Sequence, residues 1–228
     1  MSCKPNVHVR AGSKVKNRAF DFRLSRRATS AGISQSSVDR AIETLKTAGE
    51  TFSVKSVDVF DALRTLEKAK LDSSGWPEIV GGKSSPGKRW RLVFTTGTKA
   101  VREALRGNGK GGGQYFPLTA AQRWDASKGE IENGIFLGLI GALTFSGPYA
   151  ISKKKLSFDF DTLCLKLGPF KFKFAIKEKI QDYSPSPQDP FFILFYVDDD
   201  IIAARGRGGG IAFWKRTDSD FEMKHLVS

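Results

Sequence analysis

The chain contains few of the residues that support hydrolytic, metal or disulfide chemistry. Only two cysteines and two histidines occur among its 228 residues. Two cysteines, Cys3 and Cys164, cannot form a disulfide framework, which favours a reducing compartment. His8 and His225 lie near the two ends of the chain, away from the central carboxylates. The sequence therefore predicts a protein that is not an enzyme, with no catalytic residue, no bound metal and no cofactor.

Long apolar runs are also absent. The longest candidate is the segment 134–147, whose fourteen residues include four glycines, whereas a membrane-spanning helix needs about 20 apolar residues. We expect this segment to form two buried strands joined near Gly141. The N-terminal region lacks the apolar stretch of about 7 residues that a secretory signal requires. The sequence therefore predicts a protein that is not integral to a membrane.

Acidic residues are scarce at the N-terminus. Residues 1–30 contain eight basic residues and one acidic residue, Asp21, and so carry +7 of the net charge of +13. A basic leader with serines and few acids is typical of an organelle transit peptide, and a disordered basic tail is the alternative. We assign residues 1–32 to a transit peptide. Because most of the excess charge lies there, nucleic-acid binding is the least favoured function.

Two amphipathic helices are expected in residues 33–75. After Ser36 or Ser37, which can cap the first turn, apolar residues recur at helical spacing until Gly49. A second run follows Ser56 and ends near Leu71. The members of the two apolar series are Val38, Ala41, Ile42 and Leu45, then Val59, Phe60, Leu63 and Leu66. Glycine and proline residues at 75–77 and 81–87 then predict a break before the first strand.

From Trp90 onward the apolar period changes to two, which is the period of a strand. Leucines alternate over 163–167, and phenylalanines alternate with lysines over 170–176, with a turn at Gly168-Pro169. One face of the second strand is therefore aromatic and the other is largely cationic. Successive strands with short turns predict an antiparallel meander, and closure into a barrel removes its exposed edges. The predicted fold class is α+β, an antiparallel β-barrel flanked by N-terminal helices.

One insertion interrupts this pattern. Residues 99–106 resemble a short helix, and the glycine-rich stretch 107–113 follows it. The stretch matches G-x-G-x-x-G in spelling, but a dinucleotide site needs a strand before the glycines and a helix after them. Since the order here is reversed, we do not expect nucleotide binding.

Three short strands are expected near the C-terminus, at 191–197, 201–204 and 211–214. Asp198, Asp199 and Asp200 end the first of these strands. Adjacent strand residues point to opposite faces, so the triplet is a poor metal site. We expect its carboxylates to bond turn amides or to pair with Arg205 or Lys215. The arginine–glycine stretch that follows is expected to be a hairpin turn rather than an RNA-binding segment.

Three motifs together resemble the plastid lipid-associated protein (fibrillin) family. They are Tyr196-Val-Asp-Asp-Asp-Ile-(x)3-Arg205-Gly206, Gly87-Lys-Arg-Trp90-Arg-Leu-Val-Phe94-Thr and Gln122-Arg-Trp-Asp-(x)3-Gly129-Glu-Ile-Glu-Asn133. The resemblance implies a lipocalin-like barrel over residues 87–217, followed by a tail at 218–228. It also implies a plastid location (thylakoid, plastoglobule or stroma) and association with isoprenoid or other lipids. The family-motif residues are Asn133, Tyr196, Asp198, Asp200, Arg205 and Gly206.

Aromatic side chains on the predicted strands are the candidates for lining a ligand cavity. They are Trp90, Phe94, Trp124, Phe158, Phe160, Phe172 and Phe174. The alternative is a filled core, because small barrels are often packed shut by their own side chains. With the family resemblance, the sequence predicts binding or shielding of an isoprenoid quinone, a carotenoid or an acyl lipid at a thylakoid or plastoglobule surface. A filled barrel would instead favour a non-catalytic adaptor for a plastid membrane complex or enzyme.

Overall fold

Alternating apolar residues form the antiparallel strands that the sequence predicts. The computed structural model describes residues 32–83, 85–97 and 112–225. Its strands are β1 (Lys88–Thr95), β2 (Gln114–Tyr115), β3 (Thr119–Asp125), β4 (Glu130–Phe136), β5 (Gly141–Ser152), β6 (Lys155–Phe158), β7 (Thr162–Leu167), β8 (Phe170–Ala175), β9 (Phe191–Val197), β10 (Ile201–Gly206) and β11 (Ile211–Arg216).

Eight of these strands close into a barrel. Their order is β4-β3-β1-β11-β10-β9-β6-β5, and β5 pairs with β4 to complete the ring. The predicted lipocalin-like antiparallel barrel is therefore confirmed as a fold. The expected strand pair within 134–147 is confirmed too, because β4 and β5 are joined by the turn 137–140.

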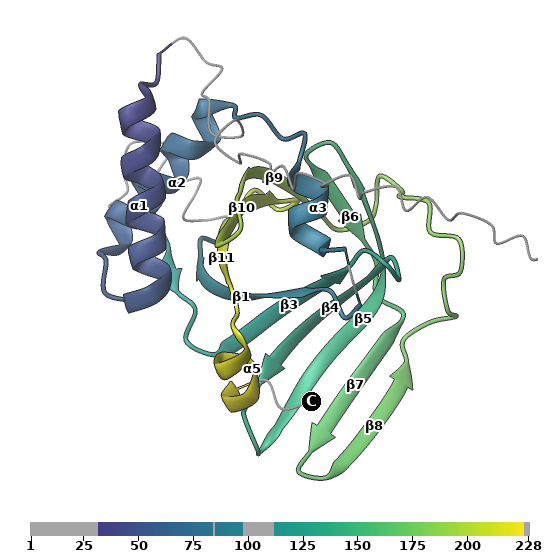
Figure 1. Cartoon of the computed structure of the whole chain (residues 1–228). Coiled ribbons are helices and arrows are strands. Elements are labelled where there is room, and N and C mark those ends of the chain that lie inside the picture. Colours follow the sequence, from purple (N-terminus) through teal and green to yellow (C-terminus); the bar gives the residue numbers. More distant parts are fainter. Residues whose placement is uncertain (1–31, 84, 98–111, 226–228) are drawn as a thin grey trace, which may run out of the picture.

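Strand β5 divides the sheet into two branches. Its first half, 141–146, pairs with β7, and its second half, 149–152, pairs with β6. Only β6 continues the ring, so the β7–β8 hairpin leaves the barrel as a separate flap (Figure 1). On this edge of β5, the second half is therefore joined through β6 to the rest of the barrel, whereas the first half is joined only to the flap.

Four helices lie in the described residues. They are α1 (Gln35–Thr51), α2 (Ser56–Ala69), α3 (Trp76–Gly81) and α5 (Ser219–His225). The two predicted N-terminal helices are confirmed, with three local corrections. The side chain of Ser34, not of Ser36 or Ser37, caps α1, by accepting from the Ser37 amide. Gly49 lies inside α1, and the expected break at 75–77 is the start of α3, where a proline fits the first turn.

The helix pair covers the outside of the barrel at β9, β10 and β11 (Figure 1). Its apolar residues are fully buried there, including Val38, Leu45, Leu63 and Leu66. Helix α3 instead covers one end of the barrel, where the Trp90 Nε1–H donates to the Val80 carbonyl at 3.1 Å. The core is therefore continuous from the helices through the sheet into the end of the barrel that α3 covers.

Some predicted segments fall outside the described residues. These are residues 1–31 of the expected transit peptide, the expected helix at 99–106 and residues 107–111 of the glycine-rich stretch. The predicted tail at 218–228 contains α5, which packs Phe221 against the outer side of the sheet at Ala121, Phe136 and Ala142.

Candidate ligand-binding cavity

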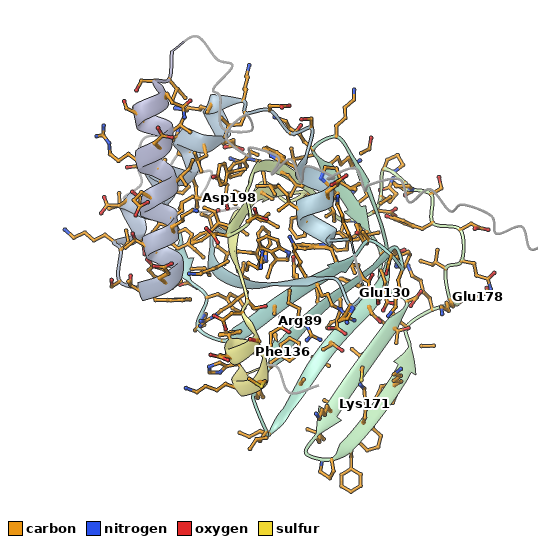
Figure 2. All side chains as sticks on the ribbon, in the orientation of Figure 1. Arg89, Glu130, Phe136, Lys171, Glu178 and Asp198 are labelled. Atoms are coloured by element: carbon orange, nitrogen blue, oxygen red, sulfur yellow. The ribbon has the colours of Figure 1, made fainter. Side chains whose placement is uncertain are left out.

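Strand register decides which side chains face the barrel interior. Residues directly opposite each other in antiparallel strands share a face, and Trp90 is opposite Gln122, which is opposite Asn133, which is opposite Phe145. Since Trp90 is completely buried in the core, this whole row points inward. The neighbouring row points outward and carries the ion pairs of Glu132 with Arg89 and Arg123; Arg89 is labelled in Figure 2.

The inward rows enclose a cavity at the end of the barrel away from α3. Its volume is about 220 Å³, and apolar side chains form nearly all of its surface. The residues that line it are Leu92, Ala120, Gln122, Asn133, Ile135, Leu143 and Phe145 of the inward rows, together with Ala121 and Gly134, which belong to the neighbouring outward row of β3 and β4. These positions lie beside the turn 137–140, whereas α3 approaches the opposite ends of the same strands, near Ala126 and Tyr149. The barrel thus has one packed end and one hollow end.

Two buried amide oxygens lie at this cavity without a hydrogen-bond partner. They are Oε1 of Gln122 and Oδ1 of Asn133, whose residues are opposite each other on β3 and β4. Leaving a buried polar atom unpaired costs about 1–3 kcal/mol, so native proteins pair most such atoms. Both side chains line the apolar cavity. Both oxygens are covered rather than exposed to the cavity, so a hydrogen-bond donor of a ligand reaches them only after the amide side chains rotate.

The seven aromatic residues expected to line the cavity do not form its wall. Trp90, Phe94, Trp124 and Phe158 are buried in the packed core. Phe160 is half-buried, and Phe172 and Phe174 lie on the flap outside the ring. The cavity wall is instead mostly aliphatic, with two amides. Gln122 was missed as a lining residue because a polar residue on a strand normally faces water; its position two residues before Trp124 places both on one face.

An aromatic row connects the cavity to the packed end. Ring centroids are 5.8 Å apart for Phe145 and Phe160, and 5.3 Å apart for Phe160 and Phe158. The row continues through Phe192 to Trp214, with separations of 5.3 and 5.2 Å. These distances are typical of packed aromatic pairs. This packed row therefore bounds the cavity on the side of the packed end.

The flap has the two faces that the sequence predicts, but its aromatic face is not covered. Phe172 and Phe174 are 46% and 50% exposed. They are opposite Leu165 and Leu163 of β7, which continue the face of β5 that carries Leu143 and Phe145. The apolar surface of the cavity therefore extends along β7 and β8 into solvent. Lys166, Cys164, Lys171 and Lys173 share the opposite face, and Figure 2 labels Lys171 on the flap.

The aspartates of the C-terminal motif attach helix α1 to the barrel. Asp198 accepts from the Tyr196 hydroxyl and from the backbone amides of residues 200 and 201, as expected for a strand end. Lys46 of α1 lies 2.5 Å from Asp200 and 3.4 Å from Asp198. Figure 2 labels Asp198. The hydrogen bond from Lys46 lowers the pKa of Asp200.

Of the two expected alternatives for these aspartates, bonds to turn amides are formed by Asp198, whereas Arg205 and Lys215 form ion pairs with the helices. Arg205 makes a two-pronged ion pair with Glu67 of α2, with N–O distances of 2.6 and 2.7 Å, and Lys215 pairs with Glu50 of α1 at 2.9 Å. The amide of Gly206 donates to Gly210 in the expected hairpin turn. Most family-motif residues are therefore positioned to hold helices and turns. Asn133 is the exception, since it lines the cavity.

Other kinds of site find little support in the part of the chain that the structure describes. No three His, Cys, Asp or Glu side chains gather there as a metal would require. None of the described helices has the length and apolar character needed to cross a bilayer. The half-buried Cys164 lies opposite Lys173 on the flap.

Comparison with known proteins finds no protein-family model and no curated protein that matches this chain. The lipocalin-like description therefore depends on the strand topology alone.

Proposed function

We propose that this protein binds a small hydrophobic molecule whose polar head donates hydrogen bonds. The observation that carries the proposal is the pair of buried, unpartnered oxygens of Gln122 and Asn133 in an otherwise apolar cavity. Ligand sites usually combine an apolar wall with a few polar groups that fix orientation. No catalytic role is proposed, because no nucleophile or acid–base pair lines the cavity.

The chemistry of the two oxygens narrows the ligand class. An oxygen acceptor pairs with a hydroxyl or N–H, so the two oxygens suit a phenol, a hydroquinone or a hydroxylated isoprenoid. Its 220 Å³ is below the range of about 300–1,000 Å³ typical of sites that enclose a ligand. The cavity thus holds a ring or a short segment, and the remaining chain lies along the open side of the barrel.

The family resemblance supports a plastid location and a role in binding or shielding isoprenoid lipids at thylakoid or plastoglobule surfaces. The basic, acid-poor leader is consistent with import into the organelle. The test is to express the full chain with a C-terminal fluorescent tag in plant cells and to compare it with a chain lacking residues 1–32. Plastid fluorescence that disappears on truncation is expected, and equal cytosolic signal from both would reject the location.

Calorimetry with a matched ligand pair tests the binding site. A long-chain 4-alkylphenol can donate a hydrogen bond and its methyl ether, which carries one more methyl group, cannot; the phenol should therefore bind about tenfold more tightly, as one buried hydrogen bond predicts. Gln122→Leu should remove this preference. Gln114→Leu makes the same change at an exposed position and should keep it. Equal affinity of the two compounds for the unaltered protein would contradict the assigned role of the oxygens.

A second candidate function, the adaptor, is favoured by the packed end of the barrel, where the tryptophans leave no space. It predicts that neither compound binds and that no lipid accompanies the purified protein in native mass spectrometry. Hydroxylated lipid in that spectrum would instead support the binding function.

A further inference from the structure

Two neighbouring turns at the hollow end of the barrel carry large exposed apolar side chains. In the β4–β5 turn, Leu139 is 83% exposed and Ile140 is 73% exposed. The β7–β8 turn lies beside it, because the Gly168 amide donates to the Ile140 carbonyl at 3.1 Å. Figure 1 shows both turns projecting from the same end of the molecule. We call their exposed side chains the apolar tip, which consists of Leu137, Leu139, Ile140, Leu167 and Phe170.

The apolar tip continues into the cavity. Phe170 is opposite Leu167, which is opposite Gly141, at the start of the strand that lines the cavity with Leu143 and Phe145. Monomeric proteins seldom leave large apolar side chains together at the surface unless that surface binds something. Here the exposed surface and the cavity wall are one sheet face, so whatever covers the tip also lies at the cavity mouth.

The charges around the tip identify the kind of surface that fits it. No acidic residue occurs between Glu132 and Asp159. The flap, residues 162–175, carries three lysines and no acid. Two of them, Lys166 and Lys171, are opposite each other just behind the turn, on the face away from the phenylalanines. Apolar side chains at a tip with lysines behind them match a bilayer surface, where side chains enter the acyl region and cations meet anionic headgroups.

We propose that the apolar tip docks on an anionic lipid surface, with the cavity mouth facing the lipid. That a ligand then moves between lipid and cavity along β7 and β8 rests on the proposed binding function. A second copy of the chain, paired through the free edge of β8, is a poorer fit. Lysines on an edge strand oppose such pairing, and Lys171 and Lys173 lie on β8.

Sedimentation with vesicles tests the docking surface. The chain without residues 1–31 should bind vesicles of phosphatidylcholine mixed with phosphatidylglycerol. Leu139→Asp should lower this partitioning at least about tenfold, since a buried apolar contact is replaced by a charge. Val57→Asp makes an equivalent change at an exposed apolar position on α2 and should alter partitioning by less than about twofold. Equal losses in both variants, or no vesicle binding by the parent chain, would overturn the proposal.

A second pair of variants tests the charge requirement. Lys166→Gln combined with Lys171→Gln should reduce binding to anionic vesicles by about fivefold per lysine. Binding to pure phosphatidylcholine should remain unchanged. Lys55→Gln combined with Lys68→Gln removes the same charge at the N-cap and in the last turn of α2 and serves as the control. Light scattering that shows a dimer of the parent chain, abolished by Leu139→Asp, would assign the tip to a second copy and reject the lipid surface.

The docking proposal and the ligand-binding proposal can be rejected independently of each other. Leu139→Asp should leave calorimetric binding of the alkylphenol unchanged in solution. Gln122→Leu should leave vesicle binding unchanged. If the parent chain shows only one of the two activities, only the proposal for the missing activity is rejected.

Discussion

The two ends of the barrel are filled differently: one is packed with large side chains, and the other contains a cavity. At the end covered by α3, Trp90, Trp124 and Trp214 are at most 2% exposed and belong to the packed core. At the other end, alanines and two amides line a cavity of about 220 Å³. Both ends are built from the same strands with the same alternation. The two ends differ in the volume of their side chains. They also differ in the partner of β5, which pairs with β7 in its first half and with β6 in its second half. One sheet therefore forms both a packed end and a hollow end.

The largest expected effect comes from emptying the packed end. Trp214→Ala should lower the free energy of unfolding by about 3–5 kcal/mol, because Trp214 packs against Trp124 and Phe192. Leu143→Ala at the hollow end should cost less than about 2 kcal/mol, since Leu143 already borders empty space. Urea denaturation measures both. Equal costs would remove the distinction between the two ends.

The attachment of α2 to the barrel is tested by Arg205→Met. The loss of its two-pronged pair with Glu67 of α2 should cost about 1–2 kcal/mol. A double-mutant cycle with Glu67→Gln isolates the pair energy. Additive effects of the two changes would show that helix α2 is held by its apolar face alone.

Asn133→Leu should separate stability from binding. Removing a buried oxygen that has no partner should raise the free energy of unfolding of the ligand-free protein by about 1 kcal/mol. Affinity for the alkylphenol should fall by less than about tenfold in the same variant, because the phenol has one donor and Gln122 can still accept it. A destabilised variant would mean that Asn133 holds the strands together rather than serving a ligand.

Substitution of a phenylalanine should destabilise the protein much less on the flap than in the core. Phe172→Ser should change the free energy of unfolding by less than about 0.5 kcal/mol, as expected for an exposed site. Phe94→Ser, the same change at a fully buried residue, should cost more than about 3 kcal/mol. Similar losses in chemical denaturation would place the flap in the core.

The smallest effect concerns acid stability at the packed end. The pKa of Asp200 is lowered from 3.8 by its hydrogen bond to Lys46. This contribution to stability is fully present above the unfolded pKa and is lost as pH falls through the folded pKa. The melting temperatures of the unaltered protein and of Asp200→Asn should therefore differ at pH 7 and converge below pH 3.8. A difference that persists at low pH would contradict the assigned pair.

Periodicity predicted the fold better than it predicted the site. Alternating leucines and phenylalanines correctly indicated β7 and β8, and helical spacing indicated α1 and α2. Alternation shows that a strand has an apolar face, but not what covers it, so Phe172 and Phe174 were expected inside the barrel. Their exposure depends on pairing with β5 rather than with the ring, and such long-range pairing has no local signal. A cavity was predicted, but its lining was not, since small residues such as Ala120 and Gly134 leave the space and carry no aromatic signal.

The branch at β5 also affects how this protein can diversify. None of the ring pairings uses the flap, residues 162–175, so its length and side chains can change without altering barrel closure. The Asp159 and Asp161 amides bond to the backbone of β5 on the α3 side of the flap, which anchors the place where the flap departs. The flap can therefore be replaced without changing the barrel, and grafting another hairpin at this position would direct the protein to a different surface.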